Sequence, residues 1–311
     1  MSLQQAIGKM CAGSRSLESS VVWLGHFAPS SRIVRSICYH TGDQISIKDP
    51  TAVRTAFTVF GSYLSVRLDE HIFRHIYFHG EYEPETTELF QRLVKPGQTW
   101  LDVGGNVGFF TMLLSKAVGD AGHVYTFEPN PAMVERIKSS IVLHGATNVH
   151  LVPHAVSNVS GQEISFYVPT GDGHNSGRAS AVKFDDLSST VKEVKVTTTN
   201  LDDYLEQNNV KPDFMKIDIE GFEINAFRGM ERTMRSHPPK LIISELSQLP
   251  GVLATPIEII TYLAGFDYLA YKITDKGLEL YETGTPVDPK DMNFAFIQKN
   301  IADELVRVLK K

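Results

Sequence analysis

A glycine-rich turn after a short apolar stretch constrains the fold of this chain most. The sequence reads Trp-Leu-Asp-Val over residues 100–103 and continues as Gly-Gly-Asn-Val-Gly over 104–108. Glycine adopts positive φ without strain and lets a ligand approach the backbone closely. An apolar strand, an acid, a glycine turn and a helix, in this order, are typical of a parallel α/β sheet with a ligand at the carboxyl ends of its strands. We therefore predict a strand at 100–103 and a helix at 108–118, although an ordinary structural turn could read the same way.

The spacing of the glycines excludes two common nucleotide loops. A dinucleotide fingerprint that starts at Gly104 needs further glycines at the positions of Asn106 and Phe109. A Walker A loop needs Gly-Lys-Ser or Gly-Lys-Thr after the turn, and the sequence has neither there. The pattern that remains is D-x-G-x-N-x-G from Asp102 to Gly108. It contains no lysine that could bind a phosphate.

An acid at the end of the next predicted strand supports a nucleoside ligand. The apolar run 123–127 ends at Glu128, about 20 residues after Gly108. A carboxylate in that place can accept hydrogen bonds from both hydroxyls of a ribose. It could also be a solvated acid before a helix that has Pro131 in its first turn. Two matching features in the expected order favour the ligand-binding interpretation.

Several segments together resemble one known family. They are Leu-Asp-Val-Gly-Gly-Asn-Val-Gly at 101–108, Thr-Phe-Glu-Pro at 126–129, His-Ala-Val-Ser at 154–157, Leu-Asp-Asp-Tyr-Leu at 201–205, and Phe-Met-Lys-Ile-Asp-Ile-Glu-Gly-Phe-Glu at 214–223. This set is similar to the FkbM family of methyltransferases, and the last segment is the most specific. The resemblance covers roughly residues 80 to 250. Gly105, where the family often has alanine, and Asn200 before Leu-Asp-Asp are mild departures.

The resemblance implies a fold, a cofactor and a reaction. The fold is α/β, the Rossmann-like class I methyltransferase fold, with a mostly parallel seven-stranded sheet and helices on both faces. The cofactor is S-adenosyl-L-methionine and its product S-adenosyl-L-homocysteine, and the reaction is usually O-methylation of a small-molecule or sugar hydroxyl, as in natural-product or glycan tailoring. We expect the tip of the third strand to lie beside the tip of the first, where the adenine would meet the backbone. The expected cofactor-binding residues are Tyr82, Asp102, Gly104, Gly105, Asn106, Gly108, Glu128, His154 and Ala155.

A second group of chemically active residues follows the strand that begins at Phe214. Alternation along an extended chain places Lys216, Asp218 and Glu220 on one side. Methyl transfer to oxygen requires removal of the hydroxyl proton and stabilisation of the developing alkoxide. Asp218 is our first choice for the base or the substrate-orienting group, and Lys216 for electrostatic support. The alternative is a structural lysine–carboxylate pair that braces the strand end. Glu220 could instead cap a helix that begins near residue 221.

Other acids and one loop histidine complete the candidate site. Glu245 ends the predicted fifth strand beside Asp218, and two carboxylates there could hold Mg²⁺. The sequence shows no clear oxygen-ligand motif around them, so we expect no metal. The glycine-rich stretch 169–180 is a candidate lid, in which His174 could serve as a base or could simply be an exposed loop histidine. The expected substrate contacts are Glu83, Ser176, Glu220 and Glu245.

The first 80 residues read as an extension to a methyltransferase domain at 81–311. Helical spacing over 1–50 predicts two or three helices, and alternation over 52–68 predicts a hairpin that turns at residues 61 and 62. The extension could cover the sheet, form a homodimer or close over the substrate. His71, His75 and His79 would share one helix face, which is better explained as a half-exposed face than as a zinc site. Tyr82 and Glu83 lie on the segment that leads into the domain, which we expect near the mouth of the cofactor pocket. The alternative for the acid is that it only stabilises the start of the following helix through the helix dipole.

Composition narrows the partners. The net charge is −6, and the sequence contains no run of lysines and arginines that would form a basic patch. We therefore expect no nucleic acid partner. No stretch approaches the roughly 20 apolar residues of a membrane helix. The N-terminus has no secretory signal pattern, and two cysteines, Cys11 and Cys38, read as free thiols of a cytoplasmic protein. Alternatives to O-methylation are N-methylation, methylation of a nucleic-acid 2′-hydroxyl, and a cofactor-binding scaffold without turnover, against which the intact set of acids and Lys216 argues.

Overall fold

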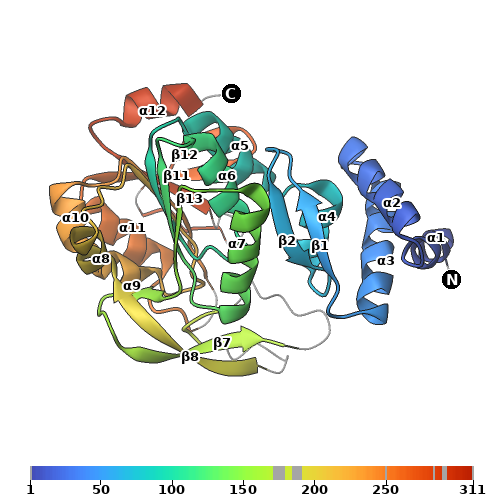
Figure 1. Ribbon diagram of the computed structural model, residues 1–311. Helices are drawn as coiled ribbons and strands as arrows, with labels where there is room; N and C mark the ends of the chain where they lie inside the picture. Colours follow the sequence, from blue (N-terminus) through green and yellow to red (C-terminus); the bar gives the residue numbers. More distant parts are fainter. Residues whose placement is uncertain are drawn as a thin grey trace.

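An eight-stranded sheet forms the centre of the molecule in the computed structural model, which describes residues 2–170, 179–183, 191–248, 251–282, 284–288 and 293–309 (Figure 1). From edge to edge its strands are β12 (Gly277–Leu280), β11 (Tyr268–Thr274), β13 (Asn293–Gln298), β10 (Leu241–Glu245), β9 (Phe214–Ile217), β3 (Thr99–Val103), β4 (His123–Phe127) and β5 (Val149–Val152). The five strands from β10 to β5 are mutually parallel, and β13 is antiparallel to both of its neighbours. The expected mostly parallel α/β sheet is confirmed. The predicted number of seven strands is one too few, because β12 pairs with β11 at the edge.

Helices cover both faces of this sheet. They are α5 (Pro84–Leu93), α6 (Phe109–Val118), α7 (Pro131–His144), α8 (Leu201–Gln207), α9 (Glu223–Arg228), α10 (Glu231–Ser236), α11 (Pro256–Ala264) and α12 (Ala302–Leu309). Successive side chains of a strand point to opposite faces of the sheet, so the strands contribute to two hydrophobic clusters. Trp100 and Phe214 belong to one cluster, whereas Leu101 and Met215 belong to the other. The rings of Trp100 and Phe214 stack with their centroids 4.8 Å apart. Strands buried on both faces explain the nearly continuous apolar runs in the sequence.

Parallel register brings the functional strand ends together. Asp102 on β3 lies opposite Lys216 on β9 and opposite Thr126 on β4. The loops that leave β3, β9 and β4 therefore meet at one edge of the sheet, as expected for a ligand-binding edge. The expected place of the third strand was wrong: β5 pairs with β4, and β4 separates it from β3.

A separate three-stranded sheet stands beside the main one. Its order is β6 (Ala155–Ser157), β8 (Val191–Asn200) and β7 (Glu163–Pro169), and it has a small core of its own. The resemblance implies one main sheet, and these three strands lie outside it. Asn200 ends β8 and caps α8, because its side chain accepts a hydrogen bond from the backbone N–H of Asp203 at 3.1 Å.

The N-terminal extension contains the predicted helices and hairpin. They are α1 (Leu3–Cys11), α2 (Arg15–Phe27), α3 (Arg32–Lys48), β1 (Val53–Phe57), β2 (Tyr63–Arg67) and α4 (His71–His79). The three N-terminal helices stand at one side of the molecule, and the hairpin and α4 lie between them and α7 (Figure 1). The backbone N–H of Ser65 on β2 donates to the hydroxyl of Ser140 on α7 at 3.0 Å. The extension is thus packed against the sheet domain and shares a hydrophobic cluster with it.

A buried ion pair joins three elements of the extension. The carboxylate of Glu18 on α2 accepts hydrogen bonds from Arg54 on β1 at 2.6 Å and from the hydroxyl of Tyr77 on α4 at 2.7 Å. Cys11 and Cys38 are free and buried, as expected of thiols. No helix among the described residues is long and apolar enough to cross a membrane.

Candidate active site

The glycine turn after β3 has the geometry that the sequence predicts. Gly104 and Gly108 have φ of +83° and +88°, a region that favours glycine. A Cβ at position 104 would lie 1.8 Å from the carbonyl oxygen of Asp218, so no other residue fits there. The backbone N–H groups of Gly104 and Gly105 both donate to the carbonyl of Phe127, at 2.9 and 3.1 Å. The turn is therefore fixed between the ends of β4 and β9.

Gly105 has a local reason to be glycine rather than alanine. A Cβ there would lie 2.4 Å from the Cγ2 methyl of Thr126 on β4. The threonine methyl occupies the space that an alanine side chain would need, which gives a packing reason for this departure from the family pattern.

Glu128 is held by backbone groups and lines a cleft. One oxygen accepts from the N–H of Asn106 at 2.7 Å, and the other accepts from the N–H of Asn130 at 2.8 Å. The side chain is buried, and burial raises the pKa of Glu128 to about 7 despite these two hydrogen bonds. Each carboxylate oxygen keeps a further lone pair, so the group can still accept hydrogen bonds from ribose hydroxyls.

Buried polar atoms without hydrogen-bond partners lie in the cleft lining, at Asn106 and Asn130, and on the strand beside it, at Asp102. Among the described residues, Oδ1 of Asp102, Oδ1 of Asn106 and Nδ2 of Asn130 are buried without a hydrogen bond. Such orphaned groups are costly unless a ligand satisfies them. The other oxygen of Asp102 accepts from the Thr111 hydroxyl at 2.6 Å, and burial raises the pKa of the Asp102 carboxyl. This set of acceptors, together with one donor, suits the ammonium and nucleoside parts of S-adenosylmethionine.

The cleft is narrow as it stands. Gly104, Asn106, Glu128, Asn130, Asp218 and Glu220 line it from the strand ends, and it encloses about 40 Å³. Ligand pockets usually enclose about 300 Å³ or more. Phe166 and Ala179 also line it. The donor chemistry therefore fits the cofactor, but the cleft must widen to admit a nucleoside.

Of the nine expected cofactor residues, Gly104, Asn106 and Glu128 line this cleft, and Asp102, Gly105 and Gly108 belong to the strand and turn that carry Gly104. The other three lie on other segments. His154 follows β5 at the edge of the sheet, and Ala155 packs with Phe166 and Val196 in the small core of the second sheet. Tyr82 packs against the rings of Phe109 and Phe110 and lines a different, larger cavity. Their expected contacts with the cofactor stay predictions.

Three acids from distant parts of the sequence converge beside the cleft. Oxygen atoms of Glu83, Asp218 and Glu245 all lie within 4.8 Å of one another. The ammonium of Lys216 lies 3.4 Å from Oδ2 of Asp218 and 3.4 Å from the carbonyl oxygen of Gly104. The sequence suggests the meeting of Asp218, Lys216 and Glu245, and the fold adds Glu83, which precedes α5. We call Glu83, Asp218 and Glu245 the acidic cluster.

Mutual repulsion shapes the charges in the acidic cluster. The neighbouring Asp218 and burial raise the pKa of Glu245 to about 9. Burial and Asp218 also raise the pKa of Glu83. Burial alone would lower the pKa of Lys216, but Asp218, Asp102 and Glu83 raise it overall, so the lysine stays charged. The site thus combines the charged Lys216 with two carboxyls, those of Glu83 and Glu245, whose pKa values are raised.

The acidic cluster also has the chemistry of a cation site. Three convergent carboxylates suit Mg²⁺ or Ca²⁺. The Lys216 ammonium beside Asp218 already supplies a positive charge to this group. The expectation that the enzyme needs no metal therefore stays a prediction, with a test given below.

Glu223 is a site residue to which the sequence assigned no role. Its carboxylate is buried, and one oxygen accepts from the backbone N–H groups of Ile219 at 3.2 Å and Gly221 at 3.1 Å. These bonds hold the loop that carries Asp218 and Glu220. The suggestion that Glu220 caps the helix was wrong, because α9 begins at Glu223 and Glu223 binds the loop backbone. The sequence did offer one signal for Glu223. It lies two residues after Gly221 in the segment that most specifically resembles the family.

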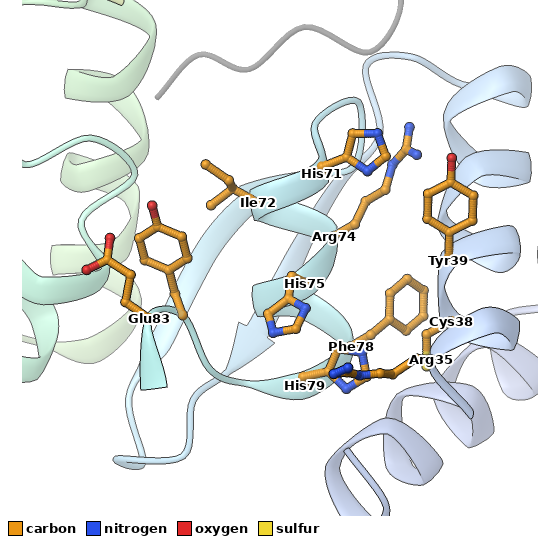
Figure 2. Close-up of a pocket in the computed structure, with 11 residues that line it drawn as sticks. Arg35, Cys38, Tyr39, His71, Ile72, Arg74, His75, Phe78, His79 and Glu83 are labelled. Carbon is orange, nitrogen blue, oxygen red and sulfur yellow. The ribbon is translucent and has the colours of Figure 1, made fainter. Parts of the chain in front are cut away.

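A larger cavity adjoins the acidic cluster on the side of the N-terminal extension. It encloses about 560 Å³ between α3, α4 and the segment that contains Tyr82 and Glu83 (Figure 2). The predicted helix face of His71, His75 and His79 lines it, although His79 is buried and its Nδ1 lies 3.2 Å from the carbonyl oxygen of Gly25. Among the described residues, no metal-binding group includes these histidines.

His174 and Ser176 lie outside the described residues, as does most of the candidate lid. Their expected roles as base and substrate contact therefore stay predictions.

Comparisons with known proteins find methyltransferases. A family model described as the methyltransferase FkbM domain matches residues 102–270, more than half of the chain. Methyltransferase 1 of Beauveria bassiana is 24% identical over 144 residues, which are 42% of this chain and 57% of that protein. Hexuronic acid methyltransferase AglP of Haloferax volcanii is 27% identical over 136 residues, which are 43% of this chain and 51% of that protein. The matches thus span little more than half of these two relatives.

Solved structures with a similar fold are more distant in sequence. An O-methyltransferase from Bacillus cereus in complex with SAH is 16% identical, with a TM-score of 0.39, and the match covers 70% of this chain and 82% of that chain. A SAM-dependent methyltransferase from Aquifex aeolicus is 17% identical, with a TM-score of 0.36, and the match covers 69% and 88%.

Proposed function

The chain belongs to the FkbM methyltransferase family, and from this premise we propose that it transfers the methyl group of S-adenosyl-L-methionine to a hydroxyl oxygen of a small molecule or sugar. One observation carries the proposal. Asp218 lines the narrow cleft, Glu83 lines the large cavity, and their carboxylates belong to one acidic cluster. A methyl donor on one side and an acceptor on the other would meet at these groups. The similarity to a hexuronic acid methyltransferase supports a sugar acceptor.

The cofactor would be held by the strand ends of the sheet. Glu128 would accept the ribose hydroxyls, and the buried oxygen of Asp102 would accept from the ammonium. Gly104 lets the ligand lie against the backbone of the turn. When bound, S-adenosyl-L-methionine supplies an electrophilic methyl group on a sulfonium.

The acidic cluster would handle the acceptor hydroxyl. Glu83 faces the large cavity and its pKa is raised, so it is a better base near neutral pH than an ordinary carboxylate. It would take the hydroxyl proton as the oxygen–methyl bond forms and the carbon–sulfur bond breaks. Asp218 would orient the hydroxyl, and the charged Lys216 would stabilise the negative charge that develops on oxygen.

Calorimetry of cofactor binding tests the premise. We expect S-adenosyl-L-methionine and S-adenosyl-L-homocysteine to bind the wild type with micromolar affinity, and Glu128→Ala to weaken both by tenfold or more, since two hydroxyl contacts would be lost. Glu135→Ala is the matched control, because Glu135 lies on the exposed face of α7 and pairs only with Lys138 among its described neighbours. Absence of binding to the wild type would remove the proposal.

A further inference from the structure

The large cavity has opposite chemistry at its two ends. Figure 2 shows Glu83 on one side and Tyr39, Cys38 and Arg35 of α3 on the other, with His75 between them. Glu83 joins the acidic cluster. Two guanidinium groups, those of Arg35 and Arg74, line the far side. A molecule that fills this space would therefore meet carboxyls at one end and arginines at the other.

Arg35 is the more available of the two arginines. Arg74 donates from Nε to the carbonyl of Leu68 at 2.6 Å, and it lies 3.6 Å from Asp43. No hydrogen bond or ion pair joins the Arg35 guanidinium to another described residue. Arginine is suited to carboxylates, because its planar fork donates two parallel hydrogen bonds. An arginine that lines a cavity of ligand size without a protein partner is free to bind an anion.

The histidines add polarity but little charge. His75 faces the open cavity, yet the protein around its ring, with the nearby His79 and Arg35, lowers its pKa to about 4. Burial and Arg35 likewise lower the pKa of His79, although its contact with Gly25 opposes this. Both rings are neutral at physiological pH and can exchange hydrogen bonds with hydroxyls. The positive charge at the far end therefore comes from the arginines.

Aromatic rings complete the lining. Tyr39 stacks on His71 with centroids 5.5 Å apart and ring planes 13° apart, and Phe78 lies lower in the cavity. Flat apolar faces beside a few polar groups are typical of sites for ring-shaped ligands. The volume of about 560 Å³ suits a ligand larger than one monosaccharide.

We propose that this cavity is the acceptor site and that it selects acceptors with a carboxylate, which Arg35 binds while the reacting hydroxyl lies at Glu83. This proposal rests on the proposed function. The acidic cluster repels an anion, so the carboxylate must lie at the arginine end. The two ends together fix the orientation of the acceptor and determine which of its hydroxyls reaches the methyl donor.

The test compares two acceptors that differ in one group. p-Nitrophenyl β-D-glucuronide carries a carboxylate where p-nitrophenyl β-D-glucoside carries a hydroxymethyl group. Ligand-observed NMR titrations of the full chain with S-adenosyl-L-homocysteine present would give both dissociation constants. We expect the wild type to bind the glucuronide about tenfold more tightly, as one charge-assisted bidentate contact allows.

Variants on the same helix assign the preference. Arg35→Gln should reduce it to about twofold or less, whereas Arg32→Gln, at the start of α3 and outside the cavity lining, should leave it unchanged. Equal binding of the two glycosides, binding of neither, or an intact preference in Arg35→Gln would overturn the proposal. Cofactor calorimetry on the same preparations separates the two ideas: cofactor binding without a glucuronide preference would reject the acceptor proposal alone, and loss of cofactor binding would reject the proposed function.

Discussion

Glu83, Asp218 and Lys216 share one small space, yet their surroundings suit them to different tasks. Asp218 lies 3.4 Å from the Lys216 ammonium, whereas Glu83 faces the large cavity, and burial together with the nearby Asp218 raises the pKa of Glu83. We expect Glu83→Gln to lower kcat by about 10²-fold or more, because the general base is lost. Cofactor affinity should stay within about twofold, since Glu83 does not line the cleft.

The companion variant separates base from orienting group. Asp218→Asn should raise KM for the acceptor as well as lower kcat. Asp218 lines the cleft, but the proposed cofactor contacts are those of Asp102 and Glu128, so this substitution of similar size should leave cofactor affinity nearly unchanged. Steady-state kinetics and calorimetry on both variants would decide. Turnover at the wild-type rate in either one would contradict the role assigned to that residue.

Metal removal tests the other chemistry open to the acidic cluster. We expect EDTA and added Mg²⁺ to leave methyl transfer unchanged, because Lys216 already offsets charge beside Asp218. The measurement is the initial rate with and without chelator. A loss that Mg²⁺ restores would show instead that Glu83, Asp218 and Glu245 hold a cation.

Glu223 makes stability depend on pH. Burial raises its pKa from 4.5 to about 7, so the folded state holds this proton more tightly than the unfolded state. Its contribution to stability is full below about pH 4.5 and is lost as pH rises through about 7. Glu223→Gln keeps an oxygen for the N–H groups of Ile219 and Gly221 but never ionises.

The variant should therefore gain stability relative to the wild type between about pH 5 and pH 8, by at most about 3 kcal/mol. Urea unfolding at both pH values would measure this difference. A difference that shrinks as the pH rises would contradict the raised pKa.

At the scale of elements, the junction of β3 and β9 depends on Gly104. Gly104 and Gly97 have nearly equal φ, +83° and +82°, but a Cβ at 104 would strike the Asp218 carbonyl, whereas a Cβ at 97 would meet nothing within 4 Å. Gly97→Ala should cost about 1 kcal/mol of unfolding free energy from backbone strain alone. Gly104→Ala should cost at least about 2 kcal/mol more and abolish cofactor binding. Equal losses in urea unfolding would show that close approach is unimportant there.

The sequence predicted most elements because each is specified locally. The strand at 123–127 has the bounds expected, and the strand predicted at 100–103 and the helix predicted at 108–118 begin within one residue of theirs, since short apolar runs end at glycine or acidic residues. Pairings between distant strands were harder. The separate sheet of β6, β7 and β8 and the edge place of β5 depend on partners that periodicity does not encode.

The candidate site shows the same division. Asp102, Glu128 and Asp218 follow strands whose parallel order the sequence implies, so their convergence could be predicted. The approach of Glu83 to Asp218 depends on where α5 enters the domain. The large cavity depends on how α3 and α4 pack, and neither arrangement leaves a pattern in a single sequence.

At the scale of the whole molecule, the extension and the sheet should unfold together, because one hydrophobic cluster includes residues of both. Glu18→Ala removes the buried partner of Arg54 and Tyr77 and should cost about 3–5 kcal/mol. The chain has two tryptophans, Trp23 on α2 and the fully buried Trp100 on β3, so a Trp23→Phe background reports the sheet alone.

In that background, Glu18→Ala should lower the unfolding midpoint seen by Trp100 fluorescence as much as the midpoint seen by circular dichroism. Glu135→Ala, which breaks an exposed pair, should shift neither. An unchanged Trp100 midpoint would mean that the extension unfolds on its own.

The two cavities draw on separate stretches of the gene product. Every residue that lines the large cavity falls within 35–83, whereas the cleft is built from residues 104–220. Substitutions in the first stretch leave the side chains of the cleft lining unchanged, although Glu83 belongs to the acidic cluster and the extension shares a hydrophobic cluster with the sheet. Recombination at a single crossover near residue 84 would exchange the whole cavity lining, Glu83 included, as one unit. A lineage with this architecture can diversify in what it modifies while the donor machinery is inherited intact.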